Sequence, residues 1–374
     1  MPEKQVYFEG YGTYRQIKDL IAVGVKKIMV VCGSSYDRFP IKQTIETMSV
    51  PVVFFRDFSP NPDYLDVLKG LALFTEEKCD FIISVGGGSA IDVAKCIVSH
   101  VNDGDKLRLL DNVVSRHLAI PTTAGSGSEA TRFAVIYSNG EKMSIEHSNM
   151  LPSHVILDPQ FLETLPPYQK KSTLSDALCQ AIESMWAKNA NVESRDYAKE
   201  SIGLILDNVE AYLSGNTESM RLMLKAANLS GKAINISKTT AAHAMSYKLS
   251  SLYGIAHGHA VALCLPYVWE HLLESKDTCF SPLRDYLNSI FSDLMQVVHA
   301  TSYEITFDVI AELFNELELY HEFDYCEDTI QELVASVNIQ RMNNHPIEIS
   351  PQILNEMYRK VLCNQIFYNK FEGK

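Results

Sequence analysis

Short, continuous apolar runs alternate with amphipathic stretches along the first part of the chain, from about Val25 to Asp158. Each run is rich in Val, Ile and Phe and is bounded by Gly, Pro, Ser or Asn. Apolar runs separated by helical patterns are typical of buried parallel strands in βαβ units. The predicted strands lie within residues 26–32, 52–58, 80–85, 117–121 and 154–158.

The periodicity changes near the Pro166-Pro167 pair. From Ser172 onward, apolar residues recur mostly with the 3.6-residue period of a helix, and strand-like runs are scarce. A chain of 374 residues suits two domains of ordinary size. We therefore predict an α/β, Rossmann-like nucleotide-binding domain over residues 1–160 and an all-α domain over residues 161–374.

Composition and charge exclude several classes of protein. The net charge of -13 argues against a nucleic-acid or anionic-membrane binder, because both partners are polyanions. No apolar run approaches the roughly 20 residues of a membrane span, and the N-terminus lacks the apolar core of a signal peptide. The eight cysteines form no CxxC pair, which favours free thiols. A cytoplasmic protein with a small-molecule substrate is expected.

A glycine-rich turn separates the apolar run at residues 80–85 from a helical pattern. Glycine lets the backbone approach a ligand, and the helix start offers free N–H groups to a pyrophosphate. The turn matches neither the GxGxxG fingerprint nor a P-loop, so a plain strand–turn–helix corner is the alternative. Asp92 and Lys95, one helical turn apart, are either part of this site or an exposed pair. The turn consists of Gly86, Gly87, Gly88 and Ser89.

A second polar loop, from Pro121 to Thr131, also follows an apolar run directly. Ligands of open α/β sheets bind beyond the carboxyl ends of the strands. Two such loops therefore predict a phosphate- and ribose-binding crevice, although either loop alone is compatible with an exposed turn. The candidate hydroxyl groups belong to Thr122, Thr123, Ser126 and Ser128.

The helical half contains residue types that bind metals. Asp176 and Gln180 are four residues apart, so one face of a helix presents both. With His243 and His257 they form a mixed oxygen and nitrogen set that suits iron or zinc and leaves positions open for a substrate oxygen. Each of these residues alone is more commonly a packing or surface residue, so the pattern by itself is not specific.

Four motifs in fixed order add the missing specificity: GGGSAIDVAK, PTTAGSGSE, DALCQAIE and HAMSYKLSSLYGIAHGHAVALCLP. Together they resemble the iron-containing (group III) alcohol dehydrogenase family over nearly the whole chain. The resemblance implies a dehydroquinate synthase-like fold, with a dinucleotide-binding α/β domain followed by a helical metal-binding domain. It also implies an NAD(P)H-linked, metal-dependent oxidoreductase acting on CH–OH groups, and a homodimer.

By this resemblance, Asp176, His243 and His257 are metal ligands, with Fe2+ as the expected ion and Zn2+ as the alternative. Gln180 stands where the family has a histidine and would be a neutral, weaker ligand. Tyr247 stands where the family has a further histidine near the substrate, four residues after His243. It is the candidate catalytic residue, donating a hydrogen bond or a proton to the substrate oxygen.

The resemblance also bears on the cofactor. Gly33 stands where many members carry an acidic residue, which binds the adenosine ribose and repels a 2′-phosphate. Glycine removes that repulsion, so NADP(H) is expected to be tolerated and is a candidate for the preferred cofactor, although Asp37 is close enough in sequence to replace the missing acid. The other predicted cofactor contacts are the two loops above, Asp92, Lys142, and Asn61 of a Pro-Asn-Pro segment.

The long histidine motif, with Gln180, looks most like the phosphonoacetaldehyde reductase branch, which makes 2-hydroxyethylphosphonate. A phosphonate dianion needs cations, so Arg132 and Lys248 are candidate substrate-binding residues, or else exposed surface charges. Three alternatives stay open. They are another short-chain alcohol, diol or hydroxy acid as substrate, a lyase or cyclase of the dehydroquinate synthase type, and a non-catalytic protein that has lost its metal through Gln180.

Overall fold

The computed structural model describes residues 5–21, 24–103, 106–109, 116–138 and 141–363. The chain divides into two compact units. The first contains Met1–Leu165 and Ser214–Gly231, and the second contains Pro166–Leu213 and Lys232–Lys374. The division therefore lies five residues beyond the predicted one, and the first unit also takes in a segment from the helical half that the sequence did not assign to it.

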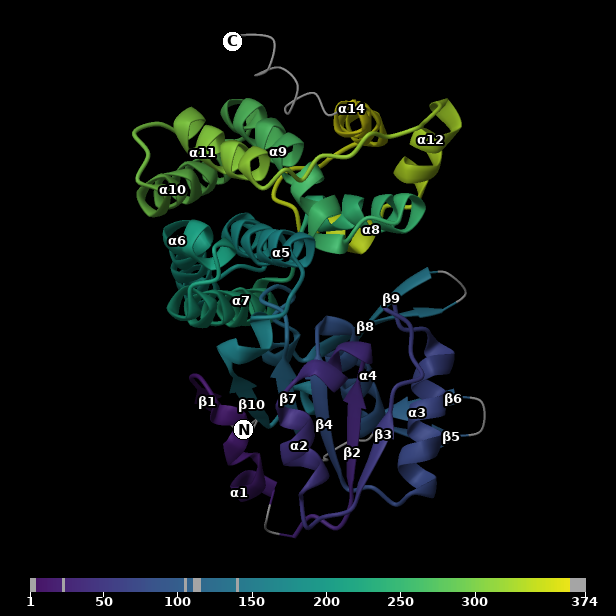
Figure 1. Ribbon diagram of the computed structural model, residues 1–374. Helices are drawn as coiled ribbons and strands as arrows, with labels where there is room; N and C mark the ends of the chain where they lie inside the picture. The colour runs from purple at the N-terminus through teal and green to yellow at the C-terminus, as the bar shows by residue number, and fades with distance from the viewer. Residues whose placement is uncertain (1–4, 22–23, 104–105, 110–115, 139–140, 364–374) are drawn as a thin grey trace. The chain divides into compact units, whose positions relative to one another are not determined.

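A six-stranded parallel sheet forms the centre of the first unit, in the order β1-β10-β7-β4-β2-β3 (Figure 1). All five predicted strands are present. The inner strands are covered on both faces, which explains their continuous apolar runs. The strands are β1 (Val6–Glu9), β2 (Ile28–Cys32), β3 (Val52–Phe55), β4 (Phe81–Gly86), β7 (His117–Pro121) and β10 (His154–Leu157).

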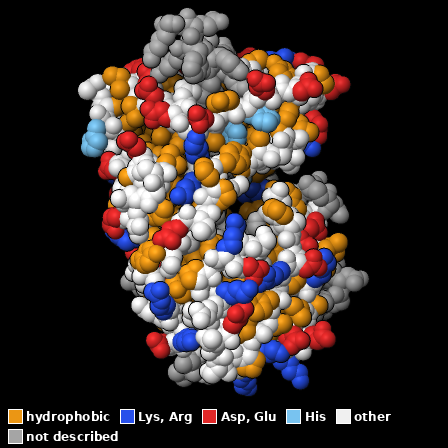
Figure 2. Space-filling model, in the orientation of Figure 1, with side chains coloured by type: hydrophobic (Ala, Val, Ile, Leu, Met, Phe, Trp, Pro, Cys, Tyr) orange, Lys and Arg blue, Asp and Glu red, His pale blue; other side chains and the backbone are white. Residues whose placement is uncertain are grey.

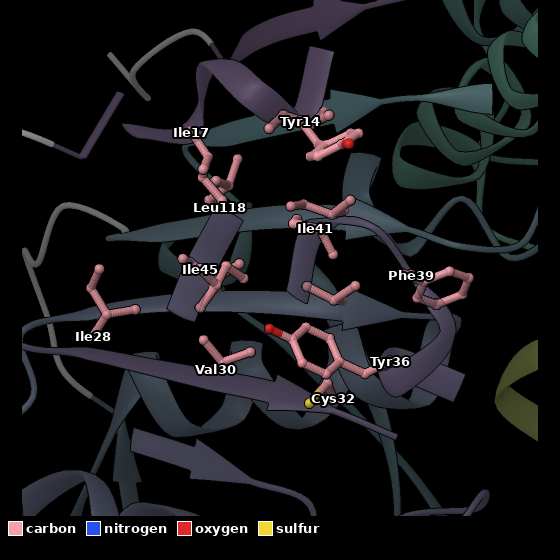
Figure 3. Packing of buried hydrophobic residues seen from close by; sticks show 14 of the residues in the cluster. Tyr14, Ile17, Ile28, Val30, Cys32, Tyr36, Phe39, Ile41, Ile45 and Leu118 are labelled. Carbon is pink, nitrogen blue, oxygen red and sulfur yellow. The ribbon is translucent and has the colours of Figure 1, made fainter. Parts of the chain in front are cut away.

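Alternate residues of each strand face opposite helical layers. Ile28 and Val30 pack with α1 and α2 in the cluster shown in Figure 3, whereas Met29 and Val31 pack with α3 and α4. Each fully buried aliphatic side chain contributes about 1.5–3 kcal/mol to folding. The helices are α1 (Ile17–Ile21), α2 (Ile41–Glu46), α3 (Tyr64–Glu76) and α4 (Gly88–Ser99).

The sequence did not predict the edge strand β1 or two antiparallel hairpins. β1 has only four residues, with its two end residues exposed, so it lacks a continuous apolar run. The hairpin strands lie outside the central sheet. Charged residues interrupt the strands over residues 100–103, 106–109 and 141–146, whereas the strand over residues 133–138 has none and was missed despite its apolar sequence. The hairpin strands are β5 (His100–Asp103) with β6 (Lys106–Leu109), and β8 (Phe133–Ser138) with β9 (Glu141–Glu146).

The direction of the strand connections reverses between β2 and β4. These two strands are neighbours, but β2 leads to β3 on one side and β4 leads to β7 on the other. In open α/β sheets this is the position where ligands bind, beyond the carboxyl ends of the strands. Gly33 follows β2 directly and Gly86 ends β4, so both predicted cofactor turns lie at this reversal.

The described part of the second unit is helical, as predicted. Helix α5 lies at its centre: all of its residues from Leu174 to Trp186 are buried, and it packs against α6 and α9. The helices are α5 (Pro167–Trp186), α6 (Val192–Leu213), α8 (Ala241–Tyr253), α9 (His257–Ser275), α10 (Ser281–Val298), α11 (Tyr303–Glu316), α12 (Glu327–Ala335), α13 (Ile339–Met342) and α14 (Pro351–Leu362).

Helix α7 (Thr217–Ser237) begins in the first unit and ends in the second. Its residues Ala227 and Gly231 pack on the second polar loop, where Gly127 has a left-handed φ of 58°. A Cβ atom on Gly127 would lie 2.6 Å from the Cα atom of Gly231, so the two glycines allow the close approach. Asn228 also donates a hydrogen bond of 2.9 Å to the buried Glu129 carboxylate.

The surface carries both signs of charge. Acidic and basic side chains lie interspersed over the face shown in Figure 2, so the net charge of -13 is not gathered into one patch there. Large exposed apolar residues such as Leu65, Val192 and Phe280 belong to separate elements, and apolar residues exposed singly are normal for a protein surface. No described helix is long and apolar enough to cross a membrane.

Candidate active site

Three helices of the second unit bring three metal-ligand side chains together. Asp176 lies within α5, His243 lies in the first turn of α8, and His257 is the first residue of α9. Asp176 Oδ1 lies 3.3 Å from His243 Nε2 and 3.9 Å from His257 Nε2. One ligand atom of each residue lies within 4.8 Å of the others. A single metal ion can therefore contact all three.

A glycine lets α9 start close enough to α5 for this arrangement. A Cβ atom on Gly258 would lie 2.0 Å from the backbone oxygen of Ser172 and 2.8 Å from the Asp176 Cβ atom. Such distances are impossible for a real side chain. Gly258 therefore fixes the spacing between His257 and Asp176.

Glu183 holds His243 from behind. It lies in the DALCQAIE motif but was not predicted as a site residue, and it is fully buried on α5. Its Oε2 atom accepts a hydrogen bond from His243 Nδ1. Its Oε1 atom accepts from Thr240 N at 3.2 Å, Thr240 Oγ1 at 2.5 Å and Ala242 N at 2.9 Å. The carboxylate is thus fully used as an acceptor.

The Glu183 carboxylate determines which nitrogen of His243 can bind a metal. A carboxylate only accepts, so Nδ1 must carry the proton and Nε2, which faces Asp176, keeps its lone pair. Burial lowers the pKa of His243, but the Glu183 and Asp176 carboxylates outweigh it and raise the pKa overall. The excess of negative charge at this site favours a bound cation.

The donor chemistry of the cluster fits the metal that the sequence predicts. One carboxylate oxygen and two imidazole nitrogens suit Fe2+ or Zn2+ and leave coordination positions for a substrate. Gln180 lies one turn after Asp176 on α5 and is buried. Its part in metal binding stays a prediction.

Tyr247 lies next to the metal-ligand cluster. Its ring stacks on the His257 ring, with the centroids 5.3 Å apart and the planes at 15°. Arg341, which the sequence did not predict, donates a hydrogen bond to the Tyr247 hydroxyl. The contact joins residues 94 positions apart in the chain, so sequence spacing carried no sign of it. The catalytic role of Tyr247 stays a prediction, now with a defined position.

In the first unit, the two predicted cofactor loops lie side by side. Thr122 N donates to the Gly86 carbonyl at 3.0 Å, because β4 and β7 are neighbours whose carboxyl ends are in register. Ser128 Oγ donates to Asp92 on α4. Asp92 also accepts from Val135 N at 2.9 Å. The turn, the helix start and the second loop thus form one connected region.

The interpretation of Asp92 and Lys95 as an exposed pair is wrong for Lys95, whose side chain is fully buried. Its ammonium group donates to Ser128 Oγ, Thr131 Oγ1 and the Phe133 carbonyl, each at 2.8 Å. Burial lowers the pKa of Lys95. Helical spacing showed that the two side chains share a face but not that the second loop covers it. Lys95 therefore anchors that loop to α4.

Asn61 and Lys142, two further predicted cofactor residues, have neighbouring residues that are hydrogen-bonded to one another or to the glycine turn. Ser89, in the first turn of α4, donates to the carbonyl of Pro60, next to Asn61. Tyr137, which pairs with Lys142 across the β8–β9 hairpin, donates from its backbone to Pro62. The Pro-Asn-Pro segment thus links the glycine turn to the hairpin that carries Lys142.

Asp37, the acid that could replace the missing one at Gly33, is paired with two cations. It forms ion pairs with Arg56 at 2.6 Å and Lys42 at 2.9 Å, and the Arg56 guanidinium and Lys42 ammonium hold its pKa well below its usual range. Arg56 directly follows β3, the strand beside β2. The end of β2 therefore has a basic as well as an acidic neighbour.

The two predicted phosphonate-binding residues both have carboxylate partners. Arg132, in the first unit, pairs with Glu146 at 2.7 Å, and its side chain is 48% exposed. Lys248 pairs with Glu332 of α12 at 2.6 Å, although the adjacent Tyr247 stacks on His257. A substrate anion would have to compete with these carboxylates.

Comparisons with known proteins agree with the geometry. Residues 4–159 match the family described as iron-containing alcohol dehydrogenase, and residues 171–362 match the C-terminal part of that family. The chain is 31% identical to long-chain-alcohol dehydrogenase 1 of Geobacillus thermodenitrificans over 75% of its length and 74% of that protein. It is 32% identical to 1,3-propanediol dehydrogenase of Klebsiella pneumoniae over 66% of each chain.

A solved structure gives a fuller match. Sulfoacetaldehyde reductase from Bifidobacterium kashiwanohense, in complex with NAD+, superposes with a TM-score of 0.82 and 28% identity. The match covers 96% of this chain and 97% of the reductase.

Proposed function

Because the chain belongs to the iron-containing alcohol dehydrogenase family, whose members are NAD(P)-linked oxidoreductases acting on CH–OH groups, we propose that it reduces phosphonoacetaldehyde to 2-hydroxyethylphosphonate by direct hydride transfer. The similarity to sulfoacetaldehyde reductase supports a short aldehyde with an anionic group as the substrate class.

The observation that carries the proposal is the cluster of Asp176, His243 and His257 with Glu183 behind it. These three residues would hold a divalent metal ion. Bound there, the ion supplies a Lewis acid that polarises a carbonyl oxygen, and NAD(P)H supplies the hydride. The chain's own residues hold the ligand side chains in place for the metal ion.

Each protein residue has a separate task. Glu183 keeps the Nε2 lone pair of His243 available, and Gly258 keeps His257 close to Asp176. Tyr247, whose ring stacks on His257, would donate a proton or hydrogen bond to the alkoxide oxygen that forms on reduction. In the first unit, the glycine turn and helix start offer backbone N–H groups to the cofactor pyrophosphate.

A second candidate function is the same reaction on an uncharged short alcohol or diol. The similarity to 1,3-propanediol dehydrogenase favours it. The two candidates differ in one property: only the first requires a cation in the pocket to bind the substrate anion.

The test is an aldehyde panel with the purified, metal-analysed protein. Phosphonoacetaldehyde is compared with propanal and with 3-hydroxypropanal, while NADPH or NADH oxidation is recorded. We expect net cofactor oxidation, about one metal ion per chain, and a kcat/KM at least about 100-fold higher for the anionic aldehyde. Equal rates on all aldehydes would favour the second candidate. The absence of net oxidation in metal-loaded protein would leave the lyase or cyclase alternative.

A further inference from the structure

Arg341 contacts Tyr247, and Tyr247 in turn stacks on His257, a predicted metal ligand. Arg341 belongs to α13 and is partly buried. Its guanidinium carbon lies 4.8 Å from the centroid of the Tyr247 ring, and that ring stacks on His257 at 5.3 Å. Its Nη1 atom donates to the Tyr247 hydroxyl and, at 3.1 Å, to Thr239 Oγ1.

The segment that carries Arg341 is firmly held. The buried Asn344 side chain donates to the carbonyls of Ser237 at 2.8 Å and Thr239 at 3.0 Å. Its backbone carbonyl accepts from Lys188 N at 2.9 Å. These bonds connect α13 to the ends of α5 and α7. The guanidinium is therefore positioned in advance, which lowers the entropy cost of binding a ligand.

Unlike Lys248 and Arg359 of the same unit, Arg341 has no carboxylate partner among the described residues. Lys248, one residue after Tyr247, is neutralised by Glu332, and Arg359 is neutralised by Glu327. Only Nη1 of Arg341 makes side-chain hydrogen bonds in the described part of the chain, which leaves Nη2 and Nε as donors. Two donors in this fork match two oxygens of a phosphonate, sulfonate or carboxylate group.

We propose that Arg341 binds the oxyanionic group of the substrate and thereby determines the substrate class. The inference rests on the proposed function, because it assumes that the aldehyde carbon is reduced at the cluster of Asp176, His243 and His257. In phosphonoacetaldehyde one methylene separates the carbonyl from the phosphonate. The anion must therefore be bound close to the metal ligands, where Arg341 offers a cation that no described carboxylate neutralises.

The experiment compares kcat/KM for phosphonoacetaldehyde, sulfoacetaldehyde and the uncharged propanal in the wild-type holoenzyme and in R341Q. We expect R341Q to lose about 100-fold on the two anionic aldehydes, mainly through KM, because a charge-assisted bidentate contact is removed. Activity on propanal should fall at least about 10-fold less than activity on the anionic aldehydes, because propanal has no oxyanionic group. A loss common to all three aldehydes would report the hydrogen bond that Arg341 donates to the Tyr247 hydroxyl. The ratio of the two anionic losses distinguishes a phosphonate from a sulfonate as the preferred group.

Two further variants control the comparison. R341K keeps the charge but not the fork, so it should recover part of the loss on anionic aldehydes. R359Q removes an exposed arginine of α14 that pairs with Glu327 of α12. It causes the same change in net charge as R341Q and should leave all three rates unchanged. Metal content and the thermal midpoint of each variant exclude misfolding as the cause.

Four results would overturn the proposal. Equal losses of R341Q on charged and uncharged aldehydes would make Arg341 a positioning residue for Tyr247. A selective loss in K248Q or R132Q, but not in R341Q, would assign the anion to a cation predicted from the sequence. A wild-type enzyme without any preference for anionic aldehydes would remove both this inference and the proposed substrate. A preference that survives in R341Q would remove the inference alone.

Discussion

Replacing Glu183 with Gln tests how the protein prepares its metal site. Glu183 Oε1 accepts three hydrogen bonds from Thr240 and Ala242, and Oε2 accepts a hydrogen bond from His243 Nδ1. In Glu183→Gln the amide oxygen can keep the first three bonds, so the fold should survive. The amide NH2 group, however, then faces Nδ1 with a proton where an acceptor is needed.

This substitution changes the protonation of Nε2, the other nitrogen of the His243 ring. To accept from the amide, His243 must adopt the tautomer with its proton on Nε2, the atom that lies 3.3 Å from Asp176 Oδ1. A protonated Nε2 has no lone pair for a metal. Loss of an outer partner of this kind lowers metal affinity by roughly 10- to 100-fold, which corresponds to about 1.4–2.8 kcal/mol.

The assay is a chelator competition that measures the dissociation constant for Zn2+ and, without oxygen, for Fe2+. Asp158→Asn is the control, because Asp158 is also fully buried and accepts backbone hydrogen bonds from Tyr14 and Gln160, but lies in the first unit. It should leave metal affinity unchanged. A Glu183→Gln protein that folds normally and binds metal within about twofold of wild type would refute the tautomer argument.

Three further predictions concern other parts of the molecule. Gly258→Ala should lower metal occupancy severely and destabilise the fold, because its Cβ atom cannot fit beside Asp176; metal analysis and thermal melting measure both effects, and full occupancy would contradict the prediction. Gly33→Asp should lower the kcat/KM ratio of NADPH to NADH by at least about 10-fold through repulsion of the 2′-phosphate. No described atom lies within 4 Å of the point where a Cβ atom of residue 33 would sit, so the protein has room for the new side chain. An unchanged ratio would therefore contradict the prediction. Burial lowers the pKa of His117 to about 3, below the unfolded value of about 6.5. The unfolded state therefore binds the extra proton between these values, so stability is lost as pH falls from about 6.5 toward 3, by about 3 kcal/mol at pH 4.5. Denaturant titrations of wild type and His117→Asn at pH 7 and pH 4.5 should show a smaller loss in the variant.

The sequence predicted the parts of the fold in which burial is uniform. Strands such as β2 and β4 are buried on both faces, so their apolar runs are continuous and visible. β1 could not be predicted, because a short edge strand with exposed end residues carries no such run. Residues 214–231 have a plain helical period, and their place in the first unit depends on tertiary contacts such as the packing of Gly127 on Gly231 and the hydrogen bond from Asn228 to Glu129.

The site was predictable to the extent that motifs carry it. Asp176, His243 and His257 were found because their spacing fits a family pattern, and the structure brings them together. Glu183 lies in one of those motifs, but its role depends on a contact across 60 positions. Arg341 lies in no motif, and its contacts depend on how α13 folds back toward α8. Long-range contacts of this kind leave no periodic trace in the sequence.

The division of α7 between the two units affects how the chain folds as it is synthesised. Domains generally fold from the N-terminus as they leave the ribosome. The first unit cannot be completed when Leu165 appears, because Ser214–Gly231 must still be made. Until then Glu129 lacks the Asn228 donor that it has in the finished protein. A fragment ending at Leu165 should therefore aggregate, whereas a chain extended past Gly231 contains every segment of the sheet-bearing unit.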